Sequence, residues 1–202
     1  MPNVIKEGGL RLKTAAVDQS NEVCYHAAAD SATLGVGDAV KTYTGGAFQS
    51  AGGPYAKSVT RCASGDAIYG VVMGIVPLSV SSSGFNLDRR HCPASTLMQV
   101  LVRPANPYDV YAITEDGTLA VADVGYCADI TGNGGGTTVT ACNTTTGMST
   151  IMLDTSTAAA STGQLKIIGF ENTADNTPAS ANSSVLVRIN ETEIVGAGSN
   201  GV

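Results

Sequence analysis

The sequence predicts an all-β protein: a single β-barrel or β-sandwich domain, jelly-roll-like, with an extended N-terminal arm. Short runs that are apolar or alternate in polarity, rich in β-branched residues, recur along nearly the whole chain between Gly, Asn, Asp and Ser. Patterns with a helical period are scarce. The length of 202 residues is one that a single large β domain commonly reaches.

Eleven segments carry the strand pattern. In chain order they are residues 22–27, 39–43, 56–61, 69–76, 97–102, 110–113, 126–130, 137–142, 149–153, 164–170 and 184–189. Residues 44–46, 115–117 and 133–134 contain the Gly, Asn and Asp residues that accept the positive φ angles of tight hairpins. This regular spacing of short strands and turns is typical of a barrel or a sandwich.

The chain divides into three predicted parts. Residues 1–20 combine an extended pattern at 10–13 with the pair Gly8-Gly9, and we expect either an arm that reaches beyond the core or the first barrel strand. Residues 21–195 are the predicted β-rich core domain. Residues 196–202 are Gly-rich and are predicted to be a flexible tail. Residues 154–161 have an Ala-rich middle but several Thr, so we expect a single helical turn or a loop there.

One four-residue pattern occurs twice, as Gly-Asp-Ala-Val at 37–40 and as Gly-Asp-Ala-Ile at 65–68. Two short matches do not establish a repeat in a Gly-rich chain. Each pair predicts a turn before a strand, closed by an Asp side chain that accepts hydrogen bonds from nearby backbone N–H groups.

Composition and charge narrow the function classes. Charged residues make up 14% of the chain and the formal net charge is -6, so nucleic acid is not an expected ligand, because its binding depends on Lys and Arg. Residues 1–7 lack the apolar run of a signal peptide, and no stretch approaches the roughly 20 apolar residues of a membrane helix. We therefore expect a soluble protein, made in a cytoplasm, with no membrane partner. A weakly charged surface favours close protein contacts, because little charge must be desolvated.

The cysteine pattern favours neither a disulfide framework nor a zinc site. The five cysteines are odd in number, widely spaced and never arranged as C-x-x-C: Cys24, Cys62, Cys92, Cys127 and Cys142. We expect reduced, mostly buried thiols.

No catalytic constellation is evident in the sequence. Of the two histidines, His26 lies on the same strand face as Cys24, which suits a redox or metal pair but is more typical of a half-buried strand. Cys92 follows His91 and two arginines, which would lower its thiol pKa, so a small hydrolase or redox enzyme remains an alternative. We predict no catalytic residues, no cofactor and no metal site.

Several segments together resemble the capsid cement or decoration proteins of tailed bacteriophages. The resemblance spans most of residues 35–190 and is carried by residues 37–40, 65–75, 98–104, 124–130, 165–170 and 185–190. It implies a β-rich structural protein without catalytic residues, located on the capsid exterior. Such a protein binds the major capsid protein and neighbouring copies of itself, bridges subunits and stabilises the viral head.

An N-terminal arm is common in proteins of this family. The resemblance therefore makes five residues candidates for an arm that contacts the capsid: Val4, Ile5, Leu10, Arg11 and Leu12. The alternatives are a head-fibre or tail module that binds a receptor or glycan, and a secreted adhesin, which the missing signal segment disfavours.

Overall fold

The all-β fold class is confirmed by a computed structural model, which describes residues 3, 5–15, 20–43, 57–79, 90–132 and 142–193. In chain order the described elements are β1 (Arg11–Thr14), β2 (Glu22–His26), β3 (Ala39–Thr42), β4 (Ser58–Arg61), β5 (Gly70–Ser79), β6 (Met98–Pro104), β7 (Val110–Thr114), η1 (Val121–Asp123), β8 (Cys127–Ala128), β9 (Ile130–Gly132), β10 (Ile151–Leu153), η2 (Thr155–Thr157), β11 (Leu165–Phe170) and β12 (Ser184–Ile189). The elements η1 and η2 are single turns of 3-10 helix.

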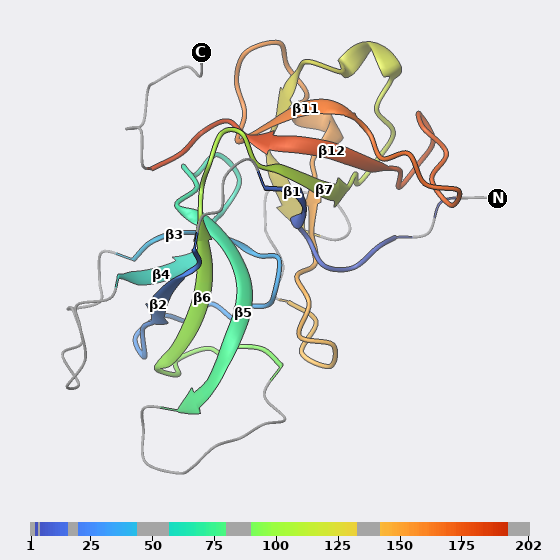
Figure 1. Cartoon of the computed structure of the whole chain (residues 1–202). Coiled ribbons are helices and arrows are strands. Elements are labelled where there is room, and N and C mark those ends of the chain that lie inside the picture. Colours follow the sequence, from blue (N-terminus) through green and yellow to red (C-terminus); the bar gives the residue numbers. More distant parts are fainter. Residues whose placement is uncertain are drawn as a thin grey trace.

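The lower half of the molecule is a closed five-stranded barrel (Figure 1). Its strands follow the order β2-β4-β3-β5-β6, and β6 returns to pair with β2. The pair β2–β4 is parallel and the other pairs are antiparallel. Small and medium side chains fill a barrel of this size, and here they include Cys24, Val40, Val59, Val72, Val100 and Val102.

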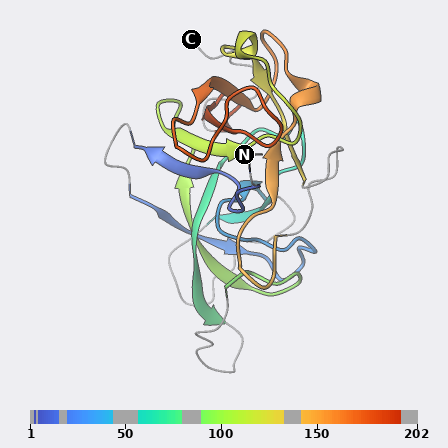
Figure 2. The same ribbon diagram turned by 90° about the vertical axis from the view of Figure 1, so that its right-hand side faces the viewer.

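The upper half is a five-stranded antiparallel sheet in the order β1-β7-β12-β11-β8, beside which β9 pairs with β10 (Figures 1 and 2). Neighbouring strands place Tyr111, Val187 and Ile167 opposite one another on the buried face. The same core cluster contains Ile68 and Val71, which come from the barrel side of the molecule. The sheet's apolar cluster therefore extends to the barrel side of the molecule, next to a separate cluster inside the barrel.

Most predicted strands are present with ends shifted by a few residues. Segment 126–130 is divided into β8 and β9, and residues 11–14 of the N-terminal part form β1. Segment 137–142 lies outside the described residues except for Cys142, as do the turns at 44–46 and 133–134 and the tail at 196–202. Within residues 154–161, where a single turn or a loop is predicted, η2 is a single turn, and the Asp154 carboxylate accepts a hydrogen bond from the Ser156 N–H at 2.9 Å. The domain boundaries at residues 20 and 195 stay predictions.

The two Gly-Asp turns form as the sequence predicts. Gly37 and Gly65 both have positive φ, +93° and +80°. The Asp38 carboxylate accepts a hydrogen bond from the Gly35 N–H, and the Asp66 carboxylate accepts one from Ala63, each at 2.7 Å. Each Asp thus closes its turn by accepting from the backbone three residues earlier.

Candidate functional site: the N-terminal segment

The N-terminal segment, residues 5–14, lies on the body of the protein. Strand β1 forms the outer edge of the five-stranded sheet and pairs with β7, with Arg11 opposite Ala112 and Leu12 opposite Tyr111. Of the two predicted alternatives, these residues make a strand, although in the sheet and not in the barrel. The register follows from the pattern, because the apolar Leu12 meets the core side of β7.

A close backbone contact holds the segment between the barrel and the sheet. The Gly8 N–H donates to the Ser149 carbonyl and the Leu10 N–H donates to the Gly37 carbonyl, both at 3.0 Å. Gly8 and Gly9 adopt positive φ, and a Cβ on Gly37 would lie 1.8 Å from the Gly8 carbonyl oxygen. Only glycine allows the two backbones to approach this closely, so the predicted Gly8-Gly9 pair serves a tertiary contact.

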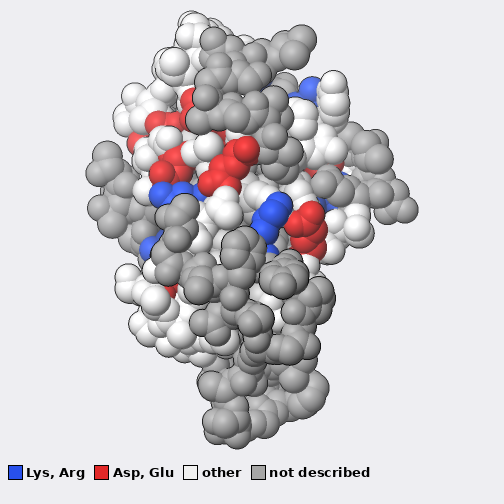
Figure 3. Space-filling view, turned by 90° about the vertical axis from the view of Figure 1, so that its left-hand side faces the viewer, with Lys and Arg blue, Asp and Glu red and all other residues white. Residues whose placement is uncertain are grey.

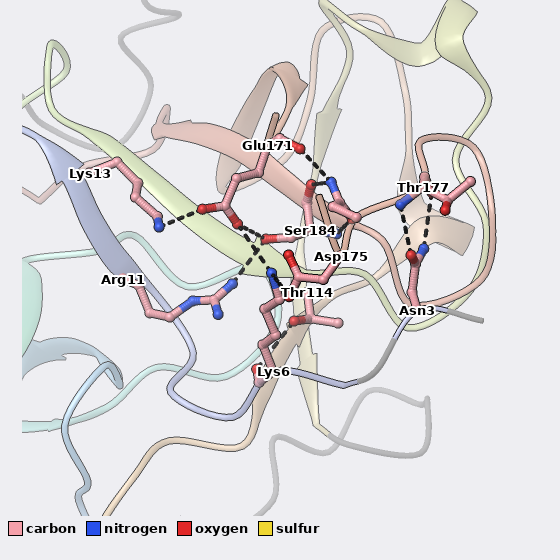
Figure 4. Close-up of polar contacts among 10 residues, drawn as sticks. Asn3, Lys6, Arg11, Lys13, Thr114, Glu171, Asp175, Thr177 and Ser184 are labelled. Carbon is pink, nitrogen blue, oxygen red and sulfur yellow. Dashed lines mark hydrogen bonds and ion pairs between the residues drawn. The ribbon is translucent and has the colours of Figure 1, made fainter. Parts of the chain in front are cut away.

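A buried carboxylate anchors the polar side of the segment, and we call this cluster the Glu171 network: Glu171, Ser184, Lys6, Arg11 and Lys13 (Figure 4). Glu171 forms an ion pair with Lys13, accepts a hydrogen bond from the Ser184 hydroxyl at 2.7 Å and lies 3.9 Å from the Lys6 ammonium. Arg11 donates to the Ser184 oxygen at 2.9 Å.

The charges around Glu171 decide its ionisation. Burial alone would raise the pKa of this carboxyl, but the Lys13 ammonium and the Ser184 hydroxyl outweigh burial and lower it. The carboxylate is therefore charged at neutral pH and holds the two lysines of the segment against the sheet.

Asn3, which precedes the N-terminal segment, forms hydrogen bonds to the loop between β11 and β12. The Asn3 side chain donates to the Thr177 carbonyl at 3.0 Å and accepts from the Thr177 N–H at 2.8 Å (Figure 4). Further along, the Glu7 carboxylate accepts hydrogen bonds from Asn143 at 3.0 Å and Thr146 at 3.2 Å. Beside residues 5–7 and 149–152 runs a cleft of about 10 Å³, enough for about one water molecule.

The predicted contact residues occupy different environments. Ile5 is 41% exposed, whereas Leu10 is 2% exposed and belongs to the apolar core. Leu12 is partly buried and packs against this core. Arg11 lies in the Glu171 network and Val4 lies outside the described residues. Capsid contact by these residues stays a prediction, and among the described candidates Ile5 exposes the most apolar surface.

The residues considered for catalysis are buried. Cys92 is fully buried, next to Leu34 in an isolated β-bridge. The His26 ring is fully buried, with Nδ1 3.0 Å from the Thr96 carbonyl and Nε2 3.1 Å from the Asp30 carboxylate. This arrangement matches the interpretation of His26 as a structural residue and connects β2 to the loop before β6.

All five thiols are free and buried, as the cysteine pattern predicts. Burial raises the pKa of Cys24 to about 11, and it also raises the pKa of Cys62, Cys127 and Cys142. These four thiols are therefore protonated at neutral pH.

The described residues hold no group of three or more His, Cys, Asp or Glu side chains arranged to bind a metal ion. Among them there is also no helix with the length and apolar character needed to span a membrane. On the face shown in Figure 3, acidic side chains gather at the upper left, with Lys and Arg beside and below them.

Comparisons with protein-family models, with curated proteins and with solved structures find no match for this chain.

Proposed function

We propose that this chain is a structural protein of a virus particle. In this proposal it binds the outer surface of a tailed-phage capsid shell, bridges neighbouring major capsid protein subunits and stabilises the head, without acting as an enzyme. A protein that bridges two subunits resists their separation only when its own parts do not move against each other. The observation that carries the proposal is the junction between barrel and sheet, which is closed by buried polar contacts.

Two buried polar side chains connect the two halves at this junction. Gln164, fully buried just before β11, donates to the carbonyls of Ala63 at 3.0 Å and Asp66 at 2.6 Å in the turn before β5. Asp38, fully buried beside β3, accepts a hydrogen bond from the Ser149 hydroxyl. Buried and satisfied polar contacts of this kind fix one arrangement, because every alternative leaves a donor or acceptor unpaired.

The N-terminal segment adds a third connection. The Leu10 N–H donates a hydrogen bond to the Gly37 carbonyl on the barrel side, while β1 pairs with β7 of the sheet. The weakly charged composition supports the proposal as well, since repeated close protein contacts on a shell need little desolvation of charge. The burial of Cys92 supports the absence of thiol catalysis.

The test compares heads with and without the protein. Purified full heads should contain the chain in a fixed ratio to the major capsid protein, and heads lacking it should release DNA at a lower temperature. Adding back the purified protein should restore the release temperature. The variant Gln164→Leu, if still folded, should bind heads but restore less of their stability.

Absence of the chain from full heads would contradict the proposal. Location at a tail or vertex together with binding to host glycans would instead identify a receptor-binding module.

A further inference from the structure

The end of the sheet half farthest from the barrel carries a nearly uncharged surface, which we call the end face: residues 120–126 and 156–162. The turn η1 projects at this end in both views of the molecule (Figures 1 and 2). The second segment lies beside it, because Cys127 and Ala159 form a β-bridge with hydrogen bonds of 2.7 and 2.8 Å.

The two segments differ in the size of their exposed side chains. Val121 is 65% exposed, Val124 40% and Tyr126 38%, and they stand among exposed Ala and Gly residues. The neighbouring segment exposes only small side chains, at Ser156, Ala160, Ser161 and Thr162. The end face thus places an exposed apolar turn next to a segment that exposes only small side chains.

The projecting turn is held rigidly. Leu119 is buried and its N–H donates to the Glu115 carboxylate at 3.1 Å. Gly125 donates to the Ile167 carbonyl at 2.9 Å, and the Ile167 N–H donates back to Tyr126 at 2.8 Å. A surface ordered before binding loses little conformational entropy when a partner covers it.

Charge is almost absent from the end face. Its one carboxylate, on Asp123, accepts a hydrogen bond from the Ala120 N–H at 2.8 Å within the turn. Lys166, opposite Cys127 in the pairing of β11 with β8, is exposed at its rim. Two copies of a chain with a net charge of -6 repel each other, and contact through a face without free carboxylates keeps that repulsion small.

We propose that the end face is a two-fold interface with a second copy of this chain. The projecting turn of each copy packs on the small-residue segment of the other, so that Val121 meets Ala160 twice across the axis. A two-fold contact needs complementary surfaces on one patch, and the large and small halves of the end face provide them.

The exposed area of the end face is large enough for a weakly associating dimer. Ten residues of the end face are exposed, which amounts to on the order of 500 Å² per copy, or about 1,000 Å² in total, near the lower limit for a specific interface. We therefore expect association in the micromolar range.

Sedimentation velocity across micromolar concentrations tests the interface with the full chain alone. The wild-type protein should shift from the mass of one chain to that of two as the concentration rises. Val121→Asp and Ala160→Asp each place a carboxylate in the interface and should weaken dimerisation at least tenfold. Val23→Asp is the matched control, because Val23 is 46% exposed on β2 of the barrel, and this variant should dimerise like wild type.

Wild-type protein that stays monomeric at the highest concentration, or a Val121→Asp protein that dimerises normally, would overturn the interface. If the wild-type protein is monomeric and Val121→Asp no longer binds heads, the end face contacts the capsid shell. That result would also overturn the dimer. A dimer that binds no heads would contradict the proposed capsid function and leave the interface standing.

Discussion

The Gln164 side chain forms hydrogen bonds with the backbone of Ile130 on one side and with the turn before the barrel strand β5 on the other. Its carbonyl oxygen accepts from the Ile130 N–H at 3.0 Å while its amide donates to Ala63 and Asp66. One buried carboxamide thus satisfies three backbone groups that come from different parts of the chain.

Replacing Gln164 with Leu should lower the free energy of unfolding by about 2 kcal/mol. The buried Ile130 N–H loses its partner at a cost of roughly 1–3 kcal/mol, and the partly buried carbonyls of Ala63 and Asp66 lose theirs at a smaller cost. Urea unfolding followed by circular dichroism measures this. Ser161→Ala, at an exposed position nearby, should change stability little. Equal stability of the Gln164 variant and wild type would show that water or other groups replace the carboxamide.

Gly37→Ala and Gly65→Ala form a matched pair, because both glycines adopt positive φ. A Cβ at Gly37 would lie 1.8 Å from the Gly8 carbonyl oxygen, whereas at Gly65 it meets nothing within 4 Å. The Gly65 variant should lose about 1 kcal/mol from backbone strain. The Gly37 variant should lose at least about 2 kcal/mol more, and thermal unfolding of both variants compares them. Similar losses would mean that the N-terminal segment does not pack on Gly37.

Asp38 should make the protein more stable in mild acid. Burial raises its pKa from 3.8 to about 6, despite the hydrogen bonds from Ser149 and Gly35. The folded state then binds a proton more tightly than the unfolded state, so stability from this group increases as the pH falls through 6 and levels off below about 4. The gain is about 3 kcal/mol for a shift of about two units.

The isosteric variant Asp38→Asn isolates this effect, since its amide does not titrate. When the pH is lowered from 7.5 to 4, the free energy of unfolding of the wild type should rise by up to about 3 kcal/mol relative to that of Asp38→Asn. Urea unfolding of both proteins at both pH values measures this difference. A constant difference between the two proteins would show that Asp38 is not the titrating group.

Glu171→Gln should loosen the N-terminal segment, since Lys13 loses its counter-charge and Lys6 keeps only its ion pair with Asp175. We expect a loss of about 1 kcal/mol, because the Lys13 side chain is partly exposed to solvent, and faster hydrogen exchange across residues 5–14. The pKa of Glu171 is lowered, so its contribution is present above pH 4.5 and disappears as the pH falls through the lowered value. Asp175→Asn is the control, because this exposed carboxylate also pairs with Lys6, and hydrogen exchange should be unchanged in it.

The five thiols should react with a thiol reagent only after unfolding, because all are buried. Native protein should show no fast reaction, and protein in denaturant should show five equivalents. Rapid modification of Cys92 in the native protein would revive the alternative of a thiol enzyme.

The sequence alone determined features that depend on near neighbours. Alternation with a period of two predicts strands wherever apolar and polar residues alternate, and the Gly-Asp pairs predict turns because both partners lie within four residues. Burial of the cysteines followed from their spacing and composition. These features became β2 to β12, the two Asp-closed turns and the free thiols.

Only the tertiary structure decided which strands pair and which polar residues are buried. The pattern at 10–13 suited an arm or the first barrel strand equally, and its actual pairing with β7 of the sheet joins residues about a hundred positions apart. Gln164 and Glu171 looked like ordinary polar residues at the ends of a strand, since their partners lie in distant segments. The division into barrel and sheet has the same cause: strand pairing follows the best packing of the whole chain, which no local pattern contains.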